Sequence, residues 1–363
     1  MSGAILLTGA TGFLGMDALT RLIERDCEEI VVLVRAQDEQ GARERLDGVL
    51  RRLYDELPPG AAQVRAVRGD LLEPGLGISA GERERLLGSV ERIVHCAASI
   101  SFELPLAEAR AINVDGVARV IELARDIAAA GSLRRVVHVS TAYVSGRHAG
   151  EFGELDLDVG QEFRNTYERS KNEAEQLLRE ATDLPLAVAR PSIVVGHRTS
   201  GWTPVFNVLY WPMRAFERGL IAEVPAREDS IVDFVPVDYV TDGIIALLDQ
   251  DAAHGTYNLV AGERALSAAE LVELHSSLTG LAPVRFVAPQ TDAGLPAGAE
   301  TFVPYFDVRC RFDDARAQQA LELAGVEKPD PKDYLGQLIE YARRSAWGKR
   351  QITRQGSFSL IGV

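Results

Sequence analysis

The stretch Ala4-Ile5-Leu6-Leu7-Thr8-Gly9-Ala10-Thr11-Gly12-Phe13-Leu14-Gly15 decides the fold of this chain. Its first five residues form an apolar run that is typical of a buried parallel strand, and an amphipathic helical pattern follows to about Arg25. A strand, a glycine-rich turn and a helix in this order are the context in which glycines make a dinucleotide site. The free N–H groups at the start of the helix, together with its dipole, favour phosphate binding.

Each glycine in the G-x-x-G-x-x-G spacing has a physical task. Gly9 allows the tight turn after the strand, Gly12 lets the backbone approach the pyrophosphate, and Gly15 lets the helix pack against the strand. The alternative is a helix cap or a loop, but the flanking strand and helix favour the nucleotide site. The predicted cofactor contacts here are Thr8, Gly9, Thr11, Gly12, Phe13, Leu14 and Gly15.

The composition is that of an ordinary globular protein, with 46% apolar and 25% charged residues among 363. A net charge of −14 argues against non-specific nucleic-acid binding. Cys27, Cys96 and Cys310 are isolated and lack metal-ligand spacing, which indicates a reducing compartment without disulfides or a metal site. No run is long and apolar enough to span a membrane, and no signal peptide is expected. We therefore expect a cytoplasmic protein.

Apolar runs and amphipathic stretches alternate along the first 200 residues. The further strands are predicted at 30–34, 64–68, 92–95, 135–139 and 186–189, and the helices between them at 38–57, 80–89, 105–130 and 166–182. This alternation predicts an α/β protein with a Rossmann-type, doubly wound parallel sheet and right-handed crossovers.

The alternation changes beyond Gly196, which indicates a second, smaller, mostly C-terminal part. The predicted parts are 1–200 as the NADP-binding Rossmann domain with 231–260 returning to its sheet, 201–230 and 261–345 as a substrate-binding subdomain, and 346–363 as a tail. For the tail we expect a frayed terminus, with a weak membrane or partner contact as the alternative.

The end of the second strand indicates which nicotinamide cofactor binds. An acid at this place usually holds the ribose 2′-hydroxyl of NAD, whereas an arginine holds the 2′-phosphate of NADP. The strand ends in Arg35 with no acid at that end, and Arg45 on the next helix adds a second positive charge. We infer NADP(H), with a merely solvated Arg35 as the alternative. The other predicted contacts at strand ends are Asp70, for the adenine amino group, Leu71, Ala97 and Ala98.

Tyr167 and Lys171 are spaced i, i+4 on a predicted helix and so share one face. Thr141 follows the strand at 135–139 and would hold the same substrate oxygen as Tyr167. A phenol has a pKa of about 10, and a nearby ammonium would lower it and make Tyr167 a proton donor to a carbonyl. Such pairs also occur by chance on helices. Only four of the 39 lysines and arginines are lysines, however, so we expect Lys171 to serve where arginine would not.

Further motifs join these sites. They lie at 8–15, 33–36, 45–46, 95–98, 101–102, 113, 137–144, 167–171, 190–196 and 233–240. With them the chain resembles an extended short-chain dehydrogenase/reductase, and more finely the fatty acyl-CoA reductase and thioester reductase branch with its male-sterility-like NAD(P)-binding domain. The resemblance runs from Ile5 to about Asp242. It implies further cofactor contacts at Asn113, Ser140, Pro191, Ser192 and Ile193, besides Tyr167 and Lys171.

The resemblance implies NADPH-dependent reduction of an acyl thioester, bound to CoA or a carrier protein, to an aldehyde and then an alcohol. Thr141, Tyr167 and Lys171 would be the catalytic residues. The alternatives are a ketone or hydroxysteroid-type reductase, a sugar-nucleotide epimerase, and a non-catalytic NADP-binding protein. The aromatic segment 202–222 and the last hundred residues would cover the active site and line an acyl tunnel, or else pack the core of the subdomain. A homodimer through exposed helices would be usual for this family.

Overall fold

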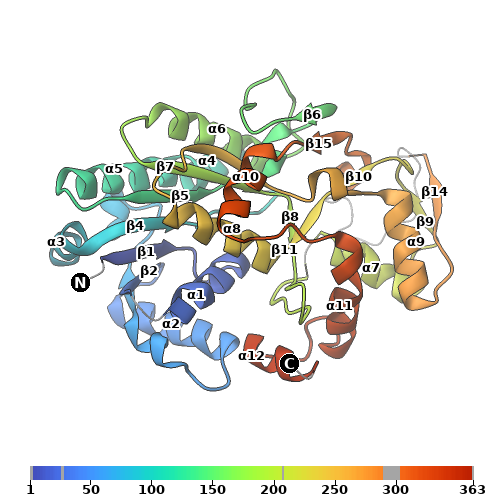
Figure 1. Ribbon diagram of the computed structural model, residues 1–363, viewed down its shortest axis with the longest axis horizontal. Coiled ribbons are helices and arrows are strands. Elements are labelled where there is room, and N and C mark those ends of the chain that lie inside the picture. Colours follow the sequence, from blue (N-terminus) through green and yellow to red (C-terminus); the bar gives the residue numbers. More distant parts are fainter. Residues whose placement is uncertain (1–2, 26–27, 207, 289–302, 362–363) are drawn as a thin grey trace.

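A seven-stranded parallel sheet forms the centre of the molecule (Figure 1). The computed structural model describes residues 3–25, 28–206, 208–288 and 303–361, so the predicted isolated Cys27 lies outside the described residues, while Cys96 and Cys310 are free thiols. The strand order is β12-β7-β5-β4-β1-β2-β3. The strands are β1 (Ala4–Thr8), β2 (Ile30–Val34), β3 (Val64–Arg68), β4 (Val90–His95), β5 (Arg135–Val139), β7 (Leu186–Pro191) and β12 (Gly255–Leu259).

Helices cover both faces of this sheet because its strands are apolar on both sides. Ile5 and Leu7 of β1 pack into one core, and Ala4 and Leu6 pack into the other. The first face carries α1 (Phe13–Arg25), α2 (Glu39–Leu53), α8 (Val237–Asp249) and α10 (Ala315–Leu323), and the second carries α3 (Ala80–Ser89), α5 (Asp115–Ala129) and α6 (Thr166–Glu180). The predicted Rossmann-type doubly wound sheet is confirmed.

The helix predicted at 105–130 is instead two helices, α4 (Leu106–Asn113) and α5, which meet at Val114. The second helix packs closely against the loop after β3: a Cβ on Gly116 would lie 3.1 Å from the Leu71 Cβ. The break leaves Asn113 at the end of α4 with its side chain buried beside α6. The apolar pattern is continuous across the break, which is why the sequence did not show it.

The C-terminal part adds short strand pairs and helices beside the sheet. The pairs are β8 (Ile193–Val195) with β11 (Phe234–Pro236), β10 (Ile231–Val232) with β13 (Leu266–Ser267), β9 (Glu223–Pro225) with β14 (Arg285–Val287), and β6 (Gly150–Phe152) with β15 (Cys310–Phe312). The helices are α7 (Tyr210–Glu217), α9 (Ala268–Thr279), α11 (Pro331–Arg344) and α12 (Arg354–Ser359). Of residues 231–260, β12 rejoins the main sheet. Within the described ranges, no helix has both the length and the apolar character needed to cross a membrane.

Residues 353–359, near the C-terminus, are folded, and the prediction of a frayed terminus is wrong for them. Thr353 caps α12 by accepting a hydrogen bond from the Gly356 N–H, and Arg354 is buried. The ring of Phe358, which the membrane alternative would expose, lies 4.9 Å from the His197 ring. Figure 1 shows α12 below the sheet, between α2 and α11. The tail looked unstructured because its partners, Asp17 on α1 and Asp55 just after α2, lie far away in the sequence.

Candidate active site

A cavity of about 850 Å³ opens at the carboxyl ends of the central strands, where β1 lies between β2 and β4. In doubly wound sheets, ligands bind at the point where the strand order reverses, which is here. The predicted site residues that line it are Thr8, Gly9, Thr11, Gly12, Phe13, Leu14, Gly15, Arg35, Arg45, Asp70, Leu71, Ala97, Ala98, Ser140, Thr141, Tyr167, Lys171, Pro191, Ser192 and Ile193. The structure thus brings together nearly all the residues that the sequence singled out.

The three glycines of the loop meet different constraints. Gly9 has a φ of +80°, and a Cβ there would lie 2.6 Å from the Ala97 nitrogen. A Cβ on Gly15 would lie 2.1 Å from the Gly9 carbonyl oxygen, so the helix could not pack as it does. A Cβ on Gly12 would meet the Gly9 oxygen at an ordinary 3.4 Å, and Gly12 is exposed towards the cavity. The protein itself therefore leaves room at Gly12, which fits a position that a ligand approaches.

Thr8 joins the ends of β1 and β4 beneath this loop. Its Oγ1 lies 2.6 Å from His95 Nδ1 and accepts a hydrogen bond of 3.2 Å from the Ala97 N–H. Burial, and then the charge of Lys171, lower the pKa of His95 to about 3, so this imidazole is neutral. The contacts fix the backbone of the two strand ends that border the cavity.

Arg35 and Arg45 lie together at the end of β2. Arg35 directly follows the strand, and Arg45 on α2 donates a hydrogen bond from its guanidinium to the Arg35 carbonyl oxygen. Both side chains are exposed and line the cavity. Two exposed positive charges at this edge suit a phosphate group, which binds arginine through charge-assisted hydrogen bonds.

The start of α6 presents Tyr167 to the cavity. Asn165 caps the helix by accepting a hydrogen bond from the Glu168 N–H. Tyr167 is hydrogen-bonded to Thr141, whose hydroxyl also donates to the Pro191 carbonyl oxygen at 3.4 Å. The predicted meeting of Tyr167 and Thr141 at one point of the cavity is therefore present in the structure.

Lys171 lies one turn further along α6 and is buried below Tyr167. Its ammonium donates to the Val139 carbonyl oxygen at 2.8 Å, and its Nζ lies 3.3 Å from His138 Nε2. Burial lowers the pKa of Lys171 to about 8, although the Glu175 carboxylate opposes this. Burial and the charge of Lys171 also hold the pKa of His138 well below its usual range, so this imidazole stays neutral and its Nε2 can accept a hydrogen bond from the ammonium.

We predicted that Lys171 lowers the pKa of Tyr167, but in the structure this pKa is raised. Burial raises the pKa of Tyr167 to about 12, and the hydrogen bond with Thr141 offsets only part of this shift. The Lys171 ammonium points at Val139 and His138 instead, so its effect on the phenol is small. At neutral pH the chain's own groups thus keep Tyr167 protonated.

Asn113, which we predicted to contact the cofactor, is not among the residues that line the cavity. Its amide donates to the Ser99 carbonyl oxygen and to the Ser170 hydroxyl, both at 3.0 Å, and its oxygen accepts from the Ser99 N–H at 2.8 Å. The side chain is 2% exposed. Asn113 thus ties the loop after β4 to α6, and we propose a positioning role for it in place of direct cofactor contact.

Three rings that were not singled out as site residues form a cluster beside Tyr167. The Phe102 ring centroid lies 5.8 Å from that of Tyr167 and is stacked at 5.3 Å on Tyr305, while the Tyr143 ring meets Tyr305 edge-on at 5.4 Å. The Tyr305 hydroxyl is held by the Asn165 amide at 2.9 Å and by Glu168. All three rings line the cavity. Phe102 and Tyr143 belong to the sequence motifs at 101–102 and 137–144, whereas no local sequence pattern indicates a role for Tyr305.

The aromatic segment 202–222 contributes little to the lining. Val208 lines the cavity, whereas Tyr210 and Met213 pack in the core between α7 and α11. Trp202 is 1% exposed and lies edge-on against Phe13 at 6.1 Å. Tyr210, Met213 and Trp202 therefore pack in the core, which was the alternative expectation, and they do not line an acyl tunnel.

The glycine loop at the switch point and the Tyr167–Lys171 pair below the cavity define an extended short-chain dehydrogenase/reductase. Within this class, the chain belongs to the NAD-binding family described as male sterility protein, whose model matches residues 7–244. This match covers more than half of the chain and includes the glycine loop, Thr141 and the Tyr167–Lys171 pair.

Comparisons with known proteins agree with this family. Fatty acyl-CoA reductase 1 of Homo sapiens is 30% identical over an alignment of 279 residues that covers 67% of this chain and 53% of that protein. The terminal R domain from the myxalamid PKS-NRPS biosynthetic pathway is 26% identical with a TM-score of 0.82, over 97% of this chain and 93% of that one. UDP-glucuronic acid 4-epimerase from Bacillus cereus, in complex with NAD, shares the fold at 17% identity and a TM-score of 0.69, over 95% and 98% of the chains. The chain spans about half the length of the curated relatives it matches.

Proposed function

We propose that this protein reduces an acyl thioester to an aldehyde with NADPH. The observation that carries the proposal is one continuous cavity that joins a dinucleotide loop to a protonated Tyr167 and then to apolar side chains. Its support from outside the chain is the likeness to proteins named fatty acyl-CoA reductases and to an R domain.

The cofactor end of the cavity fits NADPH. Gly12 leaves space for a pyrophosphate at the N-terminus of α1, where free N–H groups and the helix dipole favour an anion. Arg35 and Arg45 would hold the 2′-phosphate, for which NADH has no equivalent. When bound, this cofactor supplies a hydride to the carbonyl carbon of the substrate.

Tyr167 and Thr141 would act on the carbonyl oxygen of the thioester. Their two hydroxyl groups would stabilise the negative charge that develops on this oxygen. Because burial keeps Tyr167 protonated, it would then give its proton to that oxygen, which suits reduction rather than oxidation. The resulting hemithioacetal breaks its C–S bond and leaves as aldehyde and free thiol. A second hydride and proton would convert the aldehyde to the alcohol.

Lys171 would support Tyr167 from below. The Val139 carbonyl oxygen fixes its ammonium on the side of α6 that faces the cavity, where it can hold the nicotinamide ribose. The rings of Phe102, Tyr143 and Tyr305 give the substrate an apolar surface next to Tyr167. An apolar acyl group gains by burying its surface there.

The test offers the purified protein NADPH with acyl-CoAs of increasing chain length and, in parallel, with acyl groups on a carrier protein. Free thiol, NADPH oxidation and organic products are measured in the same samples. We expect one thiol for each NADPH when aldehyde is the product, and one thiol for two NADPH when alcohol is. NADPH oxidation with ketones but without thiol from any thioester would show a ketone reductase. Turnover of a nucleotide sugar without net redox change would show an epimerase.

A further inference from the structure

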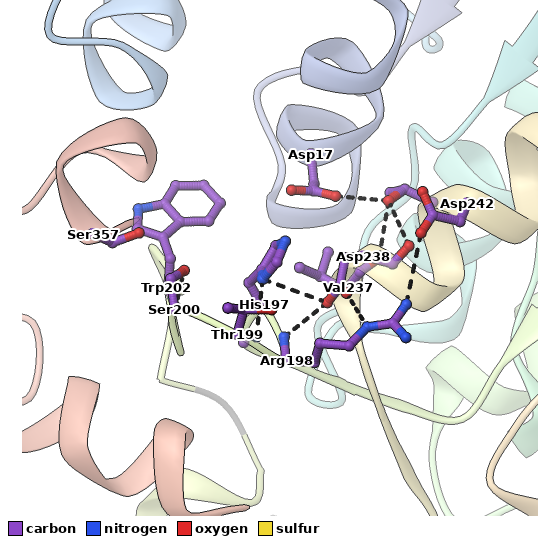
Figure 2. Close-up of polar contacts among 12 residues, drawn as sticks. Asp17, His197, Arg198, Thr199, Ser200, Trp202, Val237, Asp238, Asp242 and Ser357 are labelled. Carbon is purple, nitrogen blue, oxygen red and sulfur yellow. Dashed lines mark hydrogen bonds and ion pairs between the residues drawn. The ribbon is translucent and has the colours of Figure 1, made fainter. Parts of the chain in front are cut away.

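The buried side of α1 is held by a segment near the C-terminus, residues 352–359. Asp17, which is fully buried on this helix, accepts a hydrogen bond from Arg354 Nε at 2.7 Å and from Thr241 Oγ1 at 2.6 Å. Arg354 belongs to α12 and is 5% exposed. Figure 2 shows Asp17 on α1 facing the part of α8 that carries Asp238 and Asp242. Since Asp17 is buried and ionisable, its charge needs a partner, and Arg354 supplies it.

A second contact runs from the same segment to the glycine loop. Trp202 Nε1 donates to the Ile352 carbonyl oxygen at 3.2 Å, and its ring lies edge-on against Phe13. Phe13 is the first residue of α1 and lines the cavity. Phe13 and Asp17 are spaced i, i+4, so both contacts act on one face of the first turns of this helix. Figure 2 shows Trp202 beside Ser357 of α12.

The same segment also holds the end of α2, the helix that carries Arg45. Thr353 Oγ1 donates to the Asp55 carboxylate at 2.9 Å. The Gln355 side-chain oxygen accepts from the backbone N–H groups of Asp55 and Glu56, at 2.8 and 3.1 Å. The segment 352–359 therefore contacts α1 and the residues directly after α2. These two helices begin at the glycine loop and carry one of the two arginines.

We propose that the segment 352–359, through Arg354 and the Trp202–Phe13 contact, positions α1 and thereby sets the affinity of the cofactor site for NADP(H). No residue of 352–359 is among the residues that line the cavity, so the segment acts without touching the cofactor. Arg354 is a positioning residue whose effect passes through Asp17 to the glycine loop. The proposal requires a dinucleotide in the cavity, but it holds whichever substrate the protein reduces.

The test separates positioning from mere stability. Loss of folded protein lowers kcat per mole of chain and leaves the KM for NADPH unchanged, whereas a displaced glycine loop raises the Kd and KM for NADPH. We expect Arg354→Met to raise both at least about tenfold, which corresponds to about 1.4 kcal/mol, with kcat at saturating NADPH within about twofold. Arg354→Lys, which keeps the charge, should recover most of the affinity.

Lys328→Met is the matched control. Lys328 pairs with Asp314 at 2.5 Å and its side chain is 10% exposed, against 7% for Arg354, but the pair lies away from α1 and α2. This variant should lower the melting temperature without changing the Kd for NADPH. Should Arg354→Met fail to fold, Trp202→Phe replaces it, since this variant keeps a ring against Phe13 but loses the donor to Ile352. A Kd for NADPH equal to that of the wild type in every variant that folds would overturn the proposal.

Discussion

The residues of the cofactor end at 8–15 are neighbours in the chain, whereas the rings at the substrate end come from three distant segments. Gly9, Gly12 and Gly15 act within one turn and one helix start. Phe102 follows β4, Tyr143 follows β5, and Tyr305 comes from the C-terminal part, 140 positions from its partner Asn165. In this chain, the proposed cofactor site is thus formed by residues that are adjacent in the sequence. The proposed acyl site is assembled from separate segments. Changes at the two ends should therefore have separable effects on NADPH and on the acyl group.

The largest effect on kcat is expected at Tyr167, where the cofactor end and the substrate end of the cavity meet. Tyr167→Phe removes the proposed proton donor and should lower kcat at least about 100-fold, because general acid catalysis typically contributes a factor of this size. The Kd for NADPH should stay within about twofold, since the ring and Lys171 remain. Steady-state kinetics and nucleotide titration check both values.

Tyr257→Phe is the control for Tyr167→Phe. Tyr257 on β12 also loses a hydroxyl contact, a bond of 3.3 Å to the His254 carbonyl oxygen, but lies away from the cavity lining. Its kcat should match that of the wild type. Full activity of Tyr167→Phe would contradict the assigned proton donor.

At the cofactor end, Arg35→Ala should weaken NADPH binding about tenfold to 100-fold and leave NADH binding unchanged. The reason is the loss of charge-assisted hydrogen bonds to a 2′-phosphate, each of which contributes about 1.5–3 kcal/mol. Titration with both nucleotides measures the two constants. An equal effect on NADPH and NADH would show that Arg35 does not contact the 2′-phosphate.

Within the same loop, Gly12→Ala and Gly15→Ala should differ. The Cβ added at Gly15 would overlap the Gly9 carbonyl oxygen, so this variant should melt several degrees lower. The Cβ added at Gly12 meets no such obstacle, so its melting temperature should stay within about 2 °C while its Kd for NADPH rises about tenfold. Thermal unfolding and titration distinguish the two. Wild-type affinity in Gly12→Ala would place the pyrophosphate elsewhere.

At the substrate end, Tyr305→Ala should change acyl preference without changing the Kd for NADPH. Removing the ring widens the space beside Phe102, so kcat/KM should shift towards bulkier acyl groups by about three- to tenfold. Tyr305→Phe keeps the ring and loses the contacts with Asn165 and Glu168, so it should keep the preference and lower kcat mildly. Competition between two acyl-CoAs gives the ratio directly. If the ratio of the two kcat/KM values is unchanged in both variants, Tyr305 does not contact the acyl group.

The smallest effect concerns pH. Burial lowers the pKa of Lys171 to about 8, so its ammonium loses a proton as the pH rises through this value, and kcat/KM should fall above about pH 8. For stability the sign is opposite. Between about pH 8 and the ordinary lysine value, the unfolded chain binds the proton that the folded chain has lost, so stability rises with pH there. Lys171→Arg should shift the falling limb of the pH profile to higher pH.

The sequence predicted which residues line the cavity wherever the residues with a chemical role lie within one short segment. The glycine loop, Arg35 and the Tyr167–Lys171 pair each follow from spacing within one element. Tyr305 could not be predicted this way, because its role depends on packing against Phe102 and Asn165. Arg354 was likewise missed, since its partner Asp17 is 337 positions away. A charged residue near a chain end has the same pattern whether it is solvated or paired, and only the fold decides between the two.

The measurement that tests the central claim most directly follows the hydride. NADPH carrying deuterium at the transferred position of C4 is incubated with a long-chain acyl-CoA, and the aldehyde or alcohol is analysed by mass spectrometry alongside the free thiol. We predict one deuterium at C1 of the aldehyde, or two in the alcohol, in proportion to thiol, and neither with Tyr167→Phe. Thiol release without deuterium in the product would show hydrolysis of the thioester and contradict the proposed reductase.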